Sequence, residues 1–152
     1  MGLYMGLLLP ASTSIAAAHP CMLHLAKAEI RATAPNAPVT GGYLYIQNNS
    51  KKAHRLVSVH ANFAQHTELH EMKHEEGIMK MAPLEKGIEI PAGATVQLKP
   101  SGLHIMFTKL TAQLKPTQMH KVKLIFDDCG EMQADFMVVT KPASGHSHKH
   151  NH

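Results

Sequence analysis

The 152-residue chain has no tryptophan, and aromatic side chains make up only 5% of it. Its 15 basic residues are scattered, although they outnumber the 11 acidic residues and give a net charge of +4. Nucleic-acid readers usually combine a clustered basic face with stacking aromatic rings, so we expect no nucleic-acid partner. Apolar residues are 44% of the chain, which excludes wholesale disorder and allows one packed domain.

Most motifs of common enzyme classes are also missing. The sequence has no Gly-x-Ser-x-Gly and no glycine-rich phosphate loop. The string His70-Glu71-Met72-Lys73-His74 spells a zinc-peptidase pattern, but it falls in an expected strand and turn, where the two histidines do not share a helical face. No segment of ten or more residues has a helical pattern. We therefore expect a protein that is not an enzyme.

Histidine and methionine are abundant instead, with 13 and 10 residues. Imidazole nitrogen suits copper and zinc, and neutral thioether sulfur is soft and favours Cu(I) over hard ions. The composition therefore predicts soft-metal chemistry.

The N-terminus has the pattern of an export signal. Residues 1–18 carry no charged side chain, and an apolar stretch leads to a small-residue run that ends in Ala16-Ala17-Ala18. Such a segment is typical of a cleaved secretory signal and is short for a membrane span. We expect cleavage after Ala18 and a periplasmic location; an uncleaved anchor or a buried N-terminal strand is the alternative. The new N-terminal amine and imidazole of His19 could chelate Cu(II).

Export into an oxidising compartment makes the two cysteines informative. If Cys21 and Cys129 pair, they close a loop of about 108 residues, which the chain-entropy model values at about 5 kcal/mol. Spacing alone does not decide whether they meet. Cys21 could instead be a free thiolate, with Met22 and His24 beside it as copper ligands.

After residue 18, apolar and polar residues alternate in short segments that are separated by turn residues. This pattern predicts an all-β sandwich or barrel for residues 19–140. The expected strands are residues 28–33, 43–47, 55–61, 67–72, 78–82, 88–90, 95–98, 103–110, 122–126 and 132–138.

The composition changes at residue 141, and histidines alternate to the end of the chain. We expect residues 141–152 to form a disordered metal-binding tail, because such a tract cannot bury a core. An expression tag is the alternative, but tags are usually uninterrupted. The tail contains no methionine, so we expect it to prefer Cu(II) or Zn(II). Its possible ligands are the imidazoles of His146, His148, His150 and His152.

Four residues are the candidate metal ligands: His70, Met81, His104 and Met106. His104 and Met106 flank one residue of an expected strand, so both side chains leave the same face. His70 and Met72 form a second such pair, and Met79 and Met81 a third. Two imidazoles and two thioethers suit tetrahedral Cu(I). The alternative is that the methionines fill the core and the histidines are surface residues.

These segments resemble the PCu(A)C family of periplasmic copper chaperones. The family motif is a His, ten residues, a Met, twenty-one residues and then His-x-Met. Ten residues separate His70 from Met81, and twenty-two separate Met81 from His104; the extra residue is assigned to Lys86. The resemblance also covers residues 30–33, 42–48 and 122–126.

The resemblance implies a cupredoxin-like Greek-key β-barrel that is a monomer and binds one Cu(I) at an exposed site. The implied ligands are His70, Met81, His104 and Met106, with Met72 and Met79 as auxiliary thioethers. It also implies delivery of copper to the CuA centre of cytochrome c oxidase, directly or with a Sco-like thioredoxin-fold protein.

Two other copper proteins are alternatives. An electron-transfer cupredoxin needs two histidines and a cysteine thiolate, but no histidine follows Cys129 before His146 in the tail. A periplasmic scavenging or storage protein would bind copper or zinc through the tail, with the β-domain as its scaffold.

Overall fold

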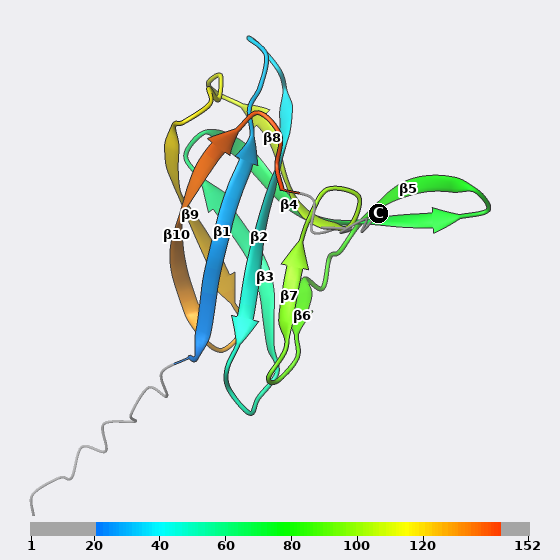
Figure 1. Cartoon of the computed structure of the whole chain (residues 1–152), viewed down its shortest axis with the longest axis vertical. Coiled ribbons are helices and arrows are strands. Elements are labelled where there is room, and N and C mark those ends of the chain that lie inside the picture. The colour runs from blue at the N-terminus through cyan, green and yellow to red at the C-terminus, as the bar shows by residue number, and fades with distance from the viewer. Residues whose placement is uncertain (1–20, 144–152) are drawn as a thin grey trace, which may run out of the picture.

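The computed structural model describes residues 21–143, which form ten strands in one continuous sheet that folds round a single core (Figure 1). Within these residues no helix occurs, and so none that could cross a membrane. The strands are β1 (Leu23–Arg31), β2 (Val39–Asn48), β3 (His54–Ala61), β4 (Ala64–Glu75), β5 (Ile78–Pro83), β6 (Ile88–Ile90), β7 (Thr95–Leu98), β8 (Leu103–Leu110), β9 (Met119–Phe126) and β10 (Gly130–Val139).

The strand order is β5-β4-β8-β2-β1-β10-β9-β3-β6, and β7 pairs with β2 outside this path. β1 and β10 are parallel, and every other pair is antiparallel. β2 is the central element, because it pairs with β1, β7 and β8. β4 and β5 form a hairpin that projects sideways from the body in Figure 1.

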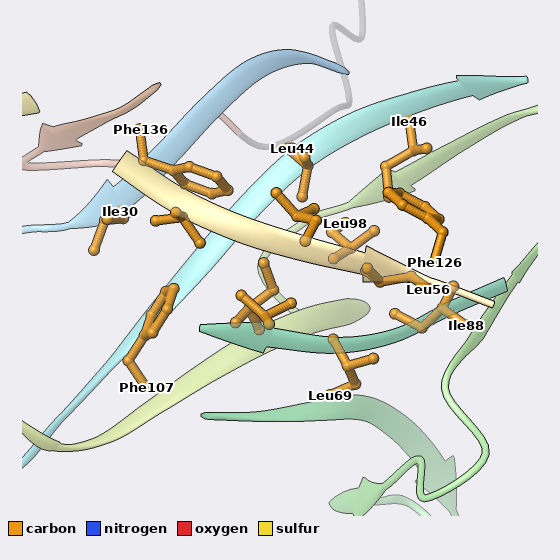
Figure 2. Close-up of a cluster of buried hydrophobic side chains, with 14 of the residues drawn as sticks. Ile30, Leu44, Ile46, Leu56, Leu69, Ile88, Leu98, Phe107, Phe126 and Phe136 are labelled. Atoms are coloured by element: carbon orange, nitrogen blue, oxygen red, sulfur yellow. The ribbon is translucent and has the colours of Figure 1, made fainter. Parts of the chain in front are cut away.

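The core is made by the inward-facing residues of the alternating strands. Figure 2 shows Leu44 and Ile46 of β2 beside Leu56, Phe126 and the other members of one apolar cluster. Burying each such side chain contributes about 1.5–3 kcal/mol. The edge of the cluster includes residues of β4 and β8, which also carry the candidate ligands.

The expected strands agree with the structure except at their ends. β1 begins at Leu23, five residues before its expected start. Its register with β2 shifts between Ala26 and Glu29, and Lys27 has a φ of 50°. This irregularity breaks the alternation of apolar residues, and so the sequence pattern missed the first half of the strand.

The two cysteines form a disulfide, with their Cα atoms 5.6 Å apart. This excludes a free Cys21 thiolate in the oxidised protein. Beside the bridge, Asp128 accepts hydrogen bonds from the Lys52 ammonium at 2.7 Å and from His54 Nδ1 at 2.6 Å. The Lys52 hydrogen bond, followed by that of His54, holds the pKa of the Asp128 carboxyl well below its usual range. Asp128 is therefore ionised at neutral pH.

Replacing both Cys21 and Cys129 by serine should lower the free energy of unfolding. The bridge spans 108 positions, and the chain-entropy model gives a loss of about 5 kcal/mol at most. Denaturant unfolding would measure the loss, and treating the wild type with a dithiol should reproduce it. Equal stability of variant and wild type would show that the bridge does not constrain the unfolded chain.

Candidate metal centre

Three neighbouring strands bring the four candidate ligands together. His70 lies on β4, Met81 on β5, and His104 and Met106 on β8. In the β4–β8 ladder, His70 is directly opposite His104. In the β4–β5 ladder, Met72 is directly opposite Met81. Because alternate residues share a face, all these side chains leave the same side of the three strands.

The other face of the same strands belongs to the core. Leu69 and Ile105 are directly opposite each other and buried, one position away from the His70–His104 pair. Figure 2 shows Leu69 and Phe107 at the margin of the apolar cluster. Packing of these residues therefore fixes which face presents the imidazoles and thioethers.

A cavity of about 480 Å³ lies over this face. Met72, Met81, His104 and Met106 line it together with the chain around Arg31–Ala34 and the turn at Pro100 and Ser101. Three sulfur atoms and one imidazole thus face one space. Soft sulfur and borderline nitrogen form a donor set that suits Cu(I).

His104 is the buried ligand candidate, with 5% of its surface exposed. Its Nδ1–H donates to the carbonyl oxygen of Gly102 at 2.9 Å, which leaves the Nε2 lone pair free. Such a backbone acceptor fixes the orientation of metal-binding histidines. Burial lowers the pKa of the His104 imidazole below 6.5; the Gly102 hydrogen bond partly opposes this, and nearby His70 adds to it. His104 is therefore neutral, the form that binds a metal.

His70 lies beside the cavity, where its ring meets that of His104 edge-on with centroids 5.7 Å apart. Its Nε2–H donates to Glu68 Oε2 at 2.6 Å. Its Nδ1 is buried and has no hydrogen-bond partner within residues 21–143. An unpaired buried nitrogen is costly, and a metal ion would satisfy it. The imidazole nitrogens without a protein partner are thus Nδ1 of His70 and Nε2 of His104, although His70 lines a neighbouring cavity with Val57 and Pro83.

The two auxiliary methionines are placed differently. Met72 lines the cavity with Met81, whereas Met79 lies two ladder pairs further along the hairpin and is 45% exposed. Gly41 is opposite Met106 in the β2–β8 ladder, and a Cβ on Gly41 would collide with the Tyr43 hydroxyl. The glycine therefore makes room for the Tyr43 ring at the wall of the cavity.

The structure also explains why the zinc-peptidase string is not a zinc site. His70 and His74 both lie on β4, where four residues span about 13 Å, too far to bind one ion together. They do share a face, and His74 pairs with Met79. The helical period gave no reason to single out His74, whereas the strand period of two places it on the face of His70 and Met72.

The extra residue in the family motif leaves the ligand strands in register. Lys86 lies in the turn after β5, where the Gly87 amide donates to the carbonyl oxygen of Leu84.

Three predictions concern residues outside the described range: cleavage after Ala18, the His19 chelate and metal binding by the tail histidines 146–152.

Solved structures with a similar fold include PCuAC domains. The copper-bound PCuAC domain from PmoF2 has a TM-score of 0.66 at 17% identity, covering 79% of this chain and 94% of that one. The solution structure of CuI-DR1885 from Deinococcus radiodurans has a TM-score of 0.63 at 25% identity, covering 86% of this chain and 85% of that one. The predicted all-β, cupredoxin-like fold of PCu(A)C type is therefore confirmed.

Residues 23–138 match the family described as "lipoprotein LpqE-like". A curated relative, the lipoprotein Lxx21020 of Leifsonia xyli subsp. xyli, is 30% identical over 120 residues, covering 79% of this chain and 71% of the relative. The chain belongs to the LpqE-like family, with a domain of PCuAC type.

The copper-free protein should lose stability as the pH falls through the range just below 6.5. Burial lowers the pKa of folded His104, so the unfolded chain binds a proton on this imidazole at higher pH than the folded protein does. A His104→Gln variant should lack this part of the pH dependence. NMR titration of the His104 ring would check the cause, and a midpoint at or above 6.5 would contradict it.

Proposed function

We propose that this protein is a copper carrier of the cell envelope that binds Cu(I) at the face shared by β4, β5 and β8. The observation that supports this most is the single cavity lined by Met72, Met81, His104 and Met106. The copper-bound PmoF2 domain and CuI-DR1885 have the same fold. The proposed ligands are His70, Met81, His104 and Met106, with Met72 as a spare thioether.

The donor set favours the reduced ion. Neutral thioethers and imidazoles add no negative charge, and soft sulfur selects Cu(I) over zinc and hard ions. The Glu68 and Gly102 hydrogen bonds orient the two histidines before the metal arrives, which reduces the ordering cost of binding.

Exposure of one ligand supports a carrier over a store or an enzyme. His104 is buried, but Met81 is 47% exposed on the hairpin. An acceptor can therefore replace the Met81 thioether first and remove the ion one ligand at a time. The proposed acceptor is the CuA centre of cytochrome c oxidase, reached directly or through a Sco-like protein.

The disulfide and the names of the relatives support an envelope location. A disulfide between Cys21 and Cys129 persists in oxidising compartments, which include the periplasm and the cell surface. The matched family and the curated relative are described as lipoproteins.

Removing the residues after Pro142 should leave the first equivalent of Cu(I) bound with unchanged affinity, because the proposed ligands all lie in the β-domain. Titration under reducing conditions, with ligands identified by X-ray absorption, would count the ion and its sulfur and nitrogen donors. Loss of all copper binding in the shortened chain would instead favour the scavenger that binds through its tail.

Replacing Met106 by isoleucine should weaken Cu(I) binding markedly and leave the β-sheet content unchanged. Isoleucine has a similar volume and suits a strand, but it lacks the thioether. Met119→Ile is the matched control, since Met119 is an exposed methionine on β9 and does not line the cavity. Affinity is measured by competition with a Cu(I) chelator; equal affinities of the two variants would refute the assignment of Met106.

A further inference from the structure

The end of the β4–β5 hairpin, residues 71–82, is an arm outside the body of the domain (Figure 1). Every residue from 73 to 81 is exposed. The arm closes with a two-residue turn in which Glu76 and Gly77 have φ values of 50° and 78°. Positive φ at both positions is the geometry of a type I′ hairpin turn, so the pairing stays in register up to the tip.

The two faces of the arm have different chemistry. One face carries charged residues, and its ion pairs join Lys73 to Glu71 at 3.5 Å and Lys80 to Glu75 at 3.2 Å. The opposite face, which we call the thioether face, carries two cross-strand pairs and no charged carboxylate or ammonium. These pairs are Met72 with Met81 and His74 with Met79.

Burial does not explain the thioether face. Met79 is 45% exposed and Met81 is 47% exposed, so only about half of each residue's surface is removed from water. The charged face also carries one exposed apolar residue, Ile78 at the tip, but it has no sulfur or imidazole donor. The segregation of every soft donor of the arm onto one face, continuous with the cavity, calls for a chemical explanation.

We propose that His74 and Met79 form a second Cu(I) site at the tip of the arm, where the ion is taken up and released. This inference rests on the proposed function, because it supplies the route to the inner site at His104 and Met106. His74 and Met79 are directly opposite each other, so their Cβ atoms are about 5 Å apart and both side chains can bind one ion.

The Met72–Met81 pair connects the two sites. It lies about 7 Å along the strands from His74 and Met79, and it also lines the cavity with His104. Methionine is long, unbranched and flexible, so either thioether can reach towards both ends. Copper moves as Cu(I) by exchange of neutral ligands; each new copper–sulfur or copper–nitrogen bond replaces an old one, and no electron is transferred.

Methyl NMR of the methionine side chains tests the second site on the full-length protein. With Cu(I) added under reducing conditions, the Met106 signal should change during the first equivalent and the Met79 signal during the second. Met119, which is 53% exposed on β9, is the internal control and should not change. A Met79 signal that stays as constant as that of Met119 up to two equivalents would overturn the second site.

Two variants test the proposed route. Met79→Leu and His74→Gln should each remove the second equivalent and slow Cu(I) transfer to a chelator several-fold, while the first equivalent keeps its affinity. Unchanged transfer rates in both variants would overturn the route. Failure of the proposed function gives a different result, because Met106 would then not respond to the first equivalent. Met119→Leu is the control variant for the rates.

Discussion

The antiparallel pairing of β4 with β8 is the constraint on which the candidate site depends. Leu69 and Ile105 face each other in the core, and His70 and His104 face each other on the outside, one position along the same ladder. A slip of β4 by one residue against β8 would turn the His70 imidazole towards the core and the Leu69 side chain towards the outer face. The hydrophobic effect therefore decides which face of the strands presents the candidate ligands. The same packing explains how an edge of the sheet can hold flexible thioethers without losing register.

The interactions that stabilise the domain and the candidate metal ligands lie at opposite ends of it. The Cys21–Cys129 bridge ties the start of β1 to the start of β10, and the buried Asn48 side chain beside it donates to carbonyl oxygens of Lys52, Ile90 and Pro91. Asn48 also accepts from Ser50, so its amide is fully used. These interactions are local to that end and involve none of the candidate ligands. The end with the candidate ligands can therefore keep an unpaired imidazole nitrogen and exposed methionines, although these features cost stability.

The candidate ligands differ in exposure across β8, β4 and β5. His104 is buried and held by a backbone carbonyl, Met72 and Met106 are half-buried, and Met79 and Met81 are exposed. Donors that are fixed and buried bind tightly, because little freedom is lost when the ion arrives. Donors that are exposed and flexible exchange readily. One face of three strands thus provides both properties without any movement of the domain.

The sequence by itself determined the element types and the donor chemistry. Alternation of apolar residues located the strands, and the spacing of His104 and Met106 put them on one face, because the period of a strand is two. The excess of histidine and methionine indicated a soft metal. Neighbouring strands are a tertiary property, so only the fold decided that β5, β4 and β8 lie side by side and that Cys21 meets Cys129 across 108 positions. Only the fold showed that Met72 lines the cavity whereas Met79, on the same arm, does not, and placed His70 beside the cavity. The physical reason is that periodicity gives the face of each strand, whereas long-range pairing and core packing select its neighbours.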